Sequence, residues 1–265
     1  MQINTYLILN NKRSHQNQIL RSVITLIFIS LSLNSFCQQR DSIASINRCQ
    51  PRITAFIIPA AFISYGIIAL DENPFNTLDF DTRAELQEDH PRFAAHVDNY
   101  IQFAPAAAVF LLNLSGIKGK NTLKDASFIY AISTAVMGGT ISTVKGSVHR
   151  LRPDGSAFNS FPSGHTATAF AAAEFLKQEY KDRSPWYGYA GYTVAIATGT
   201  LRMYNNKHWF SDVVAGAGIG ILSTKLSYLI YPQLKRLFKP LNQPNTAFMP
   251  TYQNKLFGIS YSAHF

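Results

Sequence analysis

The chain has 265 residues, with 24 Lys and Arg against 15 Asp and Glu, which gives a formal net charge of +9. Charged residues make up only 15% of the chain and hydrophobic residues 47%, whereas soluble domains are roughly 25% charged. This balance excludes disordered, collagen-like and coiled-coil chains, and the few basic residues argue against a nucleic-acid partner. Cys37 and Cys49 are the only cysteines, which excludes a disulfide framework and a zinc ribbon.

Residues 1–37 are predicted to be an export signal, with an uncleaved amino-terminal anchor as the alternative. Lys12, Arg13 and Arg21, without any acidic residue, precede an apolar run at 22–33 and a short polar stretch, as in secretory signals. Phe36 before Cys37 does not fit a lipoprotein cleavage site. Both interpretations place the rest of the chain in the cell envelope.

Six long stretches beyond residue 50 are free of charge, except for one lysine in the last, and predict six helices. They are residues 53–70, 99–117, 126–144, 155–173, 184–201 and 213–234. About 20 apolar residues span a bilayer as a helix, but stretches rich in Ala, Gly, Ser and Thr also suit the buried helices of a globule. We therefore expect an all-α, six-helix bundle over residues 38–240 that is embedded in a membrane or apposed to one.

The links between these stretches differ in charge. Basic residues fill the links at 118–124, 177–183 and 235–239, whereas segment 71–98 is acidic. The positive-inside rule puts the basic links in the cytoplasm and the acidic segment outside. That orientation starts the first stretch in the cytoplasm, while a cleaved signal would leave residue 38 outside. A retained amino-terminal segment, a buried or re-entrant stretch, and a bundle that only touches the membrane all remain open.

The carboxy-terminal tail, residues 241–265, is predicted to contain a short strand, because residues 257–265 alternate between apolar and polar. A terminal aromatic residue suits outer-membrane strands, but one strand cannot form a barrel. We expect a tail that lies on the bundle.

Three short segments lie at the same end of successive predicted helices. Residues 145–153 close the third stretch, residues 161–165 open the helical part of the fourth, and residues 202–212 join the fifth to the sixth. Short links between antiparallel helices bring such segments together. We expect six side chains to converge on one pocket: Lys145, Arg152, Arg202, His165, His208 and Asp212.

The residue types in this pocket predict phosphate chemistry. Three cations match a tetrahedral oxyanion, and Ser163 and Gly164 lead into a helix whose amino-terminal amides and dipole favour anions. Asp212 follows His208 by four residues, so the carboxylate can orient the imidazole on one helix face. An oriented histidine beside an oxyanion site is an activated nucleophile, and a second histidine can protonate the leaving oxygen.

In these residues the chain resembles the type 2 phosphatidic acid phosphatase superfamily, which includes membrane lipid phosphatases, bacterial acid phosphatases and vanadium haloperoxidases. That family has a six-helix core with Lys-x6-Arg-Pro, Pro-Ser-Gly-His and Ser-Arg-x5-His-x3-Asp, and all three occur here in order within residues 53–232. Leu201 replaces the Ser of the third motif, which puts local phosphate or arginine positioning in doubt but not the chemical step.

The resemblance implies a role for each matching residue. His208 would attack phosphorus and form a phosphohistidine, Asp212 would orient it, and His165 would act as general acid and then as base. The phosphoryl oxygens would be held by Lys145, Arg152, Arg202, Ser163 and the Gly164 amide. No metal or other cofactor would be required, because the cations and the helix terminus neutralise the developing charge.

We therefore expect a phosphatase that hydrolyses phosphate monoesters or diphosphates of lipids at the outer, periplasmic face of the inner membrane. Its partners would be the membrane and a phosphorylated lipid: phosphatidic acid, phosphatidylglycerol phosphate, a polyprenyl diphosphate or lipid A. The alternatives are a soluble exported acid phosphatase, a vanadate-dependent haloperoxidase, and a catalytically silent protein that binds phospholipid.

Neighbouring residues have simpler expected roles. His149, Arg150 and Lys207 are expected on a solvated rim, and Tyr204 and Trp209 are expected to pack. A solvated acidic face is expected for Glu85, Glu88, Asp89, His90 and His96. Close helix packing, rather than a nucleotide loop, accounts for Gly216, Gly218 and Gly220.

Overall fold

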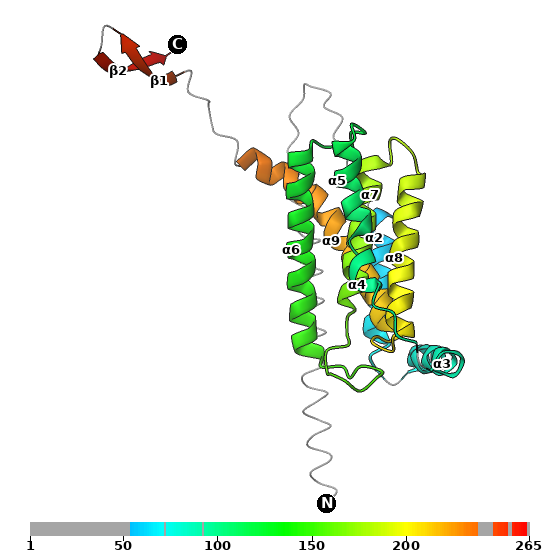
Figure 1. Ribbon diagram of the computed structural model, residues 1–265. Coiled ribbons are helices and arrows are strands. Elements are labelled where there is room, and N and C mark those ends of the chain that lie inside the picture. The colour runs from blue at the N-terminus through cyan, green and yellow to red at the C-terminus, as the bar shows by residue number, and fades with distance from the viewer. Residues whose placement is uncertain (1–53, 72, 92, 238–245, 254–255, 264–265) are drawn as a thin grey trace, which may run out of the picture. The chain divides into compact units, whose positions relative to one another are not determined.

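The computed structural model describes residues 54–71, 73–91, 93–237, 246–253 and 256–263 (Figure 1). In the last two ranges only the backbone is described. The predicted export signal or anchor at residues 1–37 lies outside the described residues.

Six of the described helices correspond to the six charge-poor stretches, and the all-α prediction is confirmed for the bundle. They are α2 (Thr54–Ile68), α5 (Ala104–Leu114), α6 (Leu123–Val148), α7 (Gly164–Tyr180), α8 (Trp186–Tyr204) and α9 (Phe210–Leu237). The fourth helix is displaced from its predicted stretch: α7 begins nine residues after position 155 and continues beyond position 173. It contains Glu174 and Glu179, which are both buried, so an absence of charge did not mark its end.

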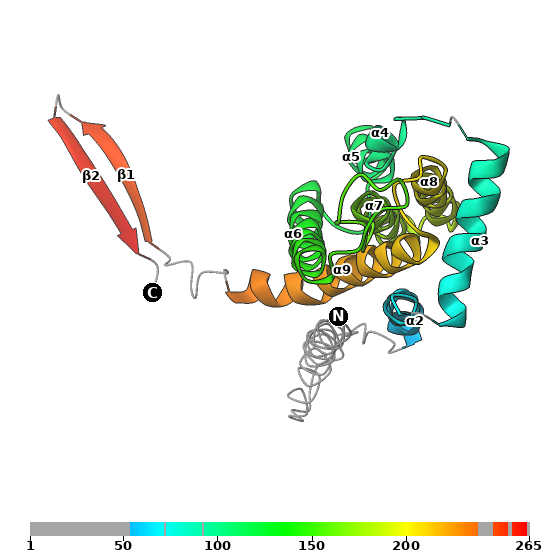
Figure 2. The same cartoon turned by 90° about the horizontal axis from the view of Figure 1, so that it is seen from below.

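The acidic segment forms a further helix that the charge pattern did not predict, α3 (Pro74–Asp89), and the short helix α4 (Asp98–Ile101) begins at its last residue and precedes α5 within the second predicted stretch. The side chain of Asn73 caps α3 by accepting a hydrogen bond from the Phe75 amide, and Pro74 occupies the first turn, where a missing N–H costs nothing. Figure 2 shows α3 lying beside α8, α9 and α2, and Figure 1 shows it at the lower end of the bundle.

Helix α7 is at the centre, surrounded by α5, α6, α8 and α9, while α2 packs on α9 (Figure 2). Small residues allow these close contacts. A Cβ on Gly220 would lie 2.2 Å from the Ala167 carbonyl oxygen, and one on Gly216 would lie 2.5 Å from the Ser163 carbonyl oxygen. The expectation that these glycines serve helix packing is confirmed.

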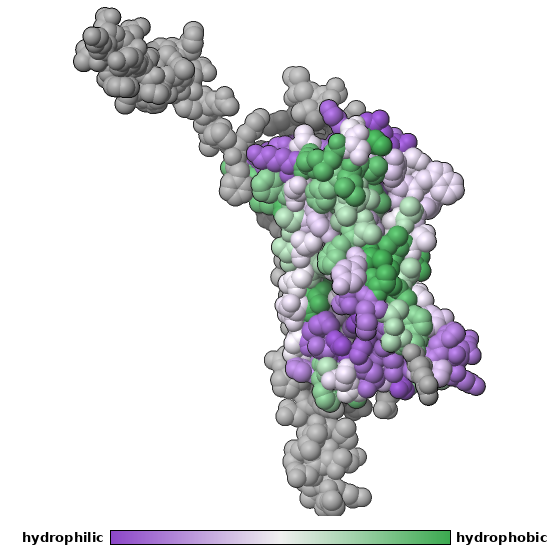
Figure 3. All heavy atoms as spheres, viewed as in Figure 1, coloured by the Kyte–Doolittle hydropathy of each residue, from purple (hydrophilic) through white to green (hydrophobic). Residues whose placement is uncertain are grey.

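Two of the described helices, α6 and α9, are long and apolar enough to cross a membrane. They are buried to different extents: 61% of the apolar window of α9 is buried in the bundle, but only 17% of that of α6. Large apolar side chains are also exposed on other outer helices, including Ile57 and Ile58 on α2, Leu111 and Leu114 on α5, and Ile196 on α8. The face in Figure 3 is apolar along much of its length and strongly polar at its lower end.

The tail contains an antiparallel hairpin of β1 (Thr246–Gln253) and β2 (Leu256–Ala263), in which Thr246 pairs with Ala263. The strand predicted at 257–265 corresponds to β2. Its partner β1 was not predicted, because Pro250 interrupts that sequence and proline is disfavoured within strands.

Candidate active site

The three motifs meet at one end of the bundle. Lys145 is in the last turn of α6, Ser163 precedes α7, and Arg202 is in the last turn of α8. His208 lies in the link between α8 and α9, and Asp212 is in the first turn of α9. A backbone hydrogen bond of 3.0 Å from the Ser163 amide to the Asp212 carbonyl joins the second motif to the third.

The two histidines lie within the electrostatic reach of each other and of the same two cations, Lys145 and Arg202. Burial lowers the pKa of His208, and the charges of Arg202 and Lys145 lower it further against the opposing effect of Asp212. His165 lies in the first turn of α7, outside the two helices long enough to cross a membrane. Burial, followed by the charge of Arg202, lowers its pKa to about 4.

The carboxylate of Asp212 is completely buried beside His208, whose side chain is also buried. Its Oδ2 lies 3.6 Å from the Nδ1 of His208, which is longer than a hydrogen bond. That Oδ2 instead accepts hydrogen bonds from the Ser160 hydroxyl, at 2.5 Å, and from the Trp209 amide, at 2.9 Å. Asp212 therefore acts on His208 in this structure mainly through its charge.

Two residues of α4 contact the site. The Oδ2 of Asp98 lies 2.7 Å from the guanidinium Nη1 of Arg202, and both side chains are buried. The Oδ1 of Asn99 lies 2.8 Å from the Nε2 of His165. Short helix α4 thus holds the third-motif arginine and the second-motif histidine together.

Several buried polar atoms at this end of the bundle have no hydrogen-bond partner among the described residues. They are the Nε atoms of Arg152 and Arg202, Oδ1 of Asp98 and Nδ1 of His208. Buried polar groups are normally paired, so unpaired guanidinium nitrogens indicate a place prepared for a polar ligand. Lys145 is more fully engaged, because its Nζ donates to the Asn159 carbonyl oxygen at 2.6 Å.

Ser163 and Gly164 form the start of α7 at this same end. The Ser163 hydroxyl is buried and lies 2.9 Å from the Thr166 hydroxyl, so it is held by its own helix. The first amides of a helix have no partner within the helix, which leaves the Gly164 region suited to an anion.

Arg150 is not the rim residue that the sequence suggested. Its side chain is only 15% exposed and bridges two buried carboxylates, Asp212 at 2.7 Å and Asp79 at 2.6 Å. The sequence interpretation was wrong because Asp79 comes from α3, which no motif marks. His149 is exposed as expected, and Lys207 is half-buried in an ion pair with Asp154 at 2.6 Å.

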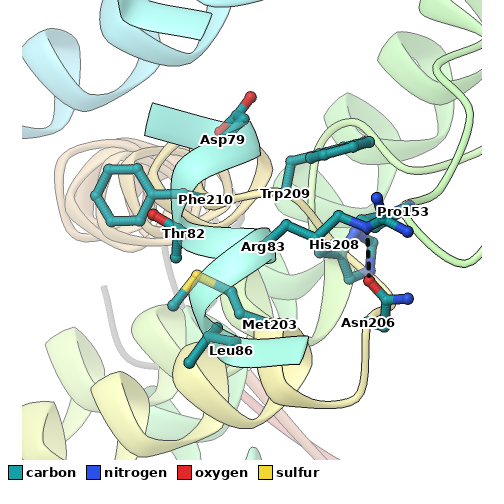
Figure 4. Close-up of a pocket in the computed structure, with 10 residues that line it drawn as sticks. All are labelled: Asp79, Thr82, Arg83, Leu86, Pro153, Met203, Asn206, His208, Trp209 and Phe210. Atoms are coloured by element: carbon teal, nitrogen blue, oxygen red, sulfur yellow. Dashed lines mark hydrogen bonds between the residues drawn. The ribbon is translucent and has the colours of Figure 1, made fainter. Parts of the chain in front are cut away.

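A small pocket lies between α3 and the third motif (Figure 4). Asp79, Thr82, Arg83 and Leu86 line it from α3, opposite Pro153, Met203, Asn206, His208, Trp209 and Phe210. The Nε of Arg83 donates to the Asn206 side chain at 3.2 Å, and this bond crosses the pocket. Helix α3 therefore closes the side of the site next to His208.

The aromatic residues near the site pack as expected. Trp209 meets Phe80 of α3 edge to face, with ring centroids 5.2 Å apart, and Tyr204 packs against Phe93. The expected acidic face is also present, because Glu85, Glu88, Asp89, His90 and His96 are exposed. Within the described part of the chain, no three His, Cys, Asp or Glu side chains are grouped as metal ligands.

The sequence did not identify four residues that contact the predicted site: Asp79, Asp98, Asn99 and Ser160. Ser160 lies just before the second motif and could have been considered from its position. The other three lie more than 60 residues before the second motif. Asp79 and Asp98 belong to a segment whose acidic character suggested only a solvated surface, and Asn99 is the residue that follows it. Only tertiary contacts reveal their place.

Comparison with known proteins gives a family match whose range includes the three motifs. Residues 126–236 match the model of the PAP2 superfamily. A lipid A 1-phosphatase of Porphyromonas gingivalis is 48% identical over 139 residues, which are 52% of this chain and 31% of that protein. A lipid A 1-phosphatase of Rhizobium etli is 33% identical over 128 residues, 42% of this chain and 53% of that protein. The chain thus spans about a third to a half of these relatives' lengths.

Among solved structures, LpxE of Aquifex aeolicus has a TM-score of 0.42 and 20% identity, over 55% of this chain and 93% of that chain. A transmembrane PAP2 type phosphatidylglycerolphosphate phosphatase from Bacillus subtilis has a TM-score of 0.43 and 19% identity, over 70% of this chain and 99% of that chain.

Proposed function

Because this chain belongs to the PAP2 superfamily, we propose that it is a phosphatase that releases phosphate from a lipid phosphate monoester or diphosphate. The observation that carries this proposal is a pair of arginines, the half-buried Arg152 and the buried Arg202, whose buried Nε atoms have no hydrogen-bond partner among the described residues. They accompany two histidines of lowered pKa, His165 and His208. Cations and oriented histidines are the groups that phosphoryl transfer requires.

In the first step His208 is the nucleophile. Its Nδ1 faces Asp212, which leaves the Nε2 lone pair to form a bond to phosphorus. The bond from phosphorus to the ester oxygen breaks, its electron pair goes to that oxygen, and His165 gives this oxygen a proton. The phosphoryl oxygens are held by Lys145, Arg152, Arg202 and the start of α7 at Ser163 and Gly164.

In the second step water replaces His208 on phosphorus. His165, now unprotonated, accepts a proton from the water while the oxygen–phosphorus bond forms and the nitrogen–phosphorus bond breaks. Inorganic phosphate and free His208 result, and His165 is again protonated for the next cycle. The negative charge of Asp212 stabilises the imidazolium that forms when the intermediate is reached.

We propose lipid A as the first substrate to test, because two relatives are named lipid A 1-phosphatase. The apolar side chains exposed on α2, α5 and α8 and the largely unburied apolar window of α6 support a lipid environment. An exposed apolar surface of this extent is typical of a membrane or protein contact. The proposed location is the bacterial inner membrane, with the site at the periplasmic surface.

The test is phosphate release by the purified protein in detergent, with a chelator present. The panel contains lipid A, phosphatidic acid, phosphatidylglycerol phosphate, a polyprenyl diphosphate and p-nitrophenyl phosphate. We expect release from at least one lipid, and a loss of at least about 10³-fold in His208→Ala, as for other catalytic nucleophiles. His149→Asn is the matched control, because this exposed histidine has a φ of 47°, which asparagine tolerates.

Three outcomes would contradict the proposal. Release from p-nitrophenyl phosphate alone, by a protein extracted without detergent, would favour a soluble acid phosphatase. Halide oxidation on adding vanadate and peroxide, without phosphate release, would favour a haloperoxidase. Full activity in His208→Ala would exclude the assigned nucleophile.

A further inference from the structure

Asp79 of α3 is buried at the candidate active site, although it comes from the acidic segment. Only 1% of its surface is exposed. Its carboxylate accepts hydrogen bonds from the Ser211 amide at 2.8 Å and the Ser211 hydroxyl at 2.6 Å, and lies 2.6 Å from an Nη of Arg150. Three polar contacts, two from Ser211 next to Asp212 and one from Arg150, thus fix a helix that lies far away in sequence.

Arg150 joins Asp79 to Asp212 through separate nitrogens. Its Nη2 binds Asp79, while its Nη1 lies 2.7 Å from both Asp212 and the Ser211 hydroxyl. The guanidinium carbon lies 5.4 Å from the centre of the Trp209 ring, a cation–π distance. A planar guanidinium can hold two carboxylates in a fixed arrangement in a way that a lysine ammonium cannot.

The Asp212 carboxylate is therefore held on both oxygens. Arg150 binds Oδ1, while the Ser160 hydroxyl and the Trp209 amide bind Oδ2. Because Nδ1 of His208 is 3.6 Å from Oδ2, the effect of Asp212 on His208 depends on where the carboxylate sits and how far its charge is compensated.

We propose that Arg150 and Asp79 are positioning residues, which fix the Asp212 carboxylate and set the net charge that acts on His208. The proposal rests on the proposed function in one respect, the role of His208 as nucleophile. It assigns to α3 a part in catalysis that the three motifs do not contain.

The charges in this chain of contacts predict opposite effects for its two members. Asp79, Arg150 and Asp212 together carry a net charge of −1. Removing the charge of Asp79 makes the set neutral, which stabilises the His208 imidazolium less and lowers its pKa. Removing the charge of Arg150 leaves a net charge of −2 on the set, which stabilises the imidazolium more and raises the pKa of His208.

Other charged or titratable groups face His208 from the helices around it, and none of them is altered when Asp79 or Arg150 is replaced. They are Lys145 from α6, His165 from α7, Arg202 from α8 and Arg83 from α3.

The experiment compares pH profiles of kcat/KM for wild type, Asp79→Asn and Arg150→Gln, with dioctanoyl phosphatidic acid in detergent micelles as probe. We expect the acid limb, which reports the free nucleophile, to move down in Asp79→Asn and up in Arg150→Gln, by about one pH unit each. We also expect kcat to fall about tenfold or more, as when a residue that holds a functional side chain in place is lost. KM should stay within about twofold, because neither residue touches substrate in the proposed mechanism.

Two further variants separate positioning from structural support. Arg150→Lys keeps the charge, so its acid limb should stay near the wild-type position, while its kcat should fall because an ammonium cannot hold both carboxylates in place. If Arg150→Gln does not fold, the downward shift in Asp79→Asn beside an unmoved limb in Arg150→Lys is the test. Glu174→Gln is the matched control, because Glu174 is also a buried carboxylate in an ion pair, with Lys225 at 2.8 Å. It lies nine residues along α7 from His165 and should leave the acid limb unchanged.

An acid limb that stays in place, or that moves in the same direction in Asp79→Asn and Arg150→Gln, would overturn the proposal even if kcat falls. His208→Ala distinguishes this failure from failure of the proposed function. Full activity in His208→Ala removes the nucleophile assignment itself, whereas an inactive His208→Ala with unmoved limbs refutes only the role of Asp79 and Arg150.

Discussion

The two histidines should give the proposed reaction an optimum in mildly acidic solution. Catalysis needs His208 unprotonated and His165 protonated, and both pKa values lie below the ordinary 6.5, that of His165 at about 4. Because kcat/KM reports the free enzyme, it should be highest below pH 6.5 and decline toward alkaline pH. A kcat/KM that keeps rising above about pH 8 would contradict the lowered pKa values.

A phosphoryl group bound beside His165 adds negative charge, which raises the pKa of its imidazole. Since kcat reports the enzyme–substrate complex, the alkaline limb of kcat should lie at higher pH than that of kcat/KM. The two profiles come from one set of initial rates over a range of substrate concentrations, so no variant is needed. Coincident alkaline limbs would mean that His165 is not the group protonated in the complex.

Asp98 should lower the affinity of the site for inorganic phosphate. Its carboxylate lies 2.7 Å from Arg202 and places a negative charge where the phosphoryl oxygens would bind. Asp98→Asn should lower the inhibition constant of inorganic phosphate about tenfold, which corresponds to about 1.4 kcal/mol. Asp154→Asn is the control, because that carboxylate pairs with Lys207 at the rim. Weaker inhibition in Asp98→Asn would mean that Asp98 mainly holds Arg202 in place.

Among the site residues, those that belong to the three motifs could be predicted from the sequence. Those that reach the site only through tertiary contacts could not. The spacing of the three motifs was enough to predict that Lys145, Arg202, His165 and His208 lie at the same end of the bundle. No local pattern distinguishes Asp79 from the exposed acids that follow it, because its burial depends on Arg150, 71 residues later.

Stretches without charge predict where the helices lie better than they predict where each helix begins and ends. Glu174 extends α7 beyond its predicted stretch, because Lys225 and the Tyr192 hydroxyl satisfy the carboxylate inside the bundle. The start of α7 was predicted by its motif rather than by hydropathy, since the stretch began at residue 155. The presence of α3 was missed because its face toward the bundle is built around Asp79 rather than around apolar residues.

Close packing of α9 on α7 should make Gly220 intolerant of any side chain. A Cβ there would lie 2.2 Å from the Ala167 carbonyl oxygen, so Gly220→Ala should lower the free energy of unfolding by ~1–3 kcal/mol, the usual range for overpacking. Gly139→Ala on α6 is the matched control, because nothing lies within 4 Å of its Cβ position. Alanine favours helix there, so thermal unfolding in detergent should show the control unchanged or stabilised. Equal losses in both would contradict the packing argument.

The whole bundle has two chemically different ends. The α3 helix and its exposed acidic residues lie at the site end, where Lys145, Arg150 and Arg202 each contact site residues. The basic links lie at the other end, as the Lys120 amide bonded to the Glu179 carbonyl and the ion pair between Lys235 and Asp125 show. The positive-inside rule then predicts that the site faces away from the cytoplasm.

Cysteine labelling tests this orientation directly. Cys37 and Cys49 are first replaced by serine, and single cysteines are placed at two exposed positions, Ser156→Cys in the loop at the site end and Asp182→Cys in a basic link. In spheroplasts a membrane-impermeant maleimide should label Ser156→Cys, whereas Asp182→Cys should react only after lysis. Phosphate release by each variant verifies that it is folded. The reverse pattern would place the site in the cytoplasm, and labelling of both before lysis would mean that the bundle only rests on the outer surface.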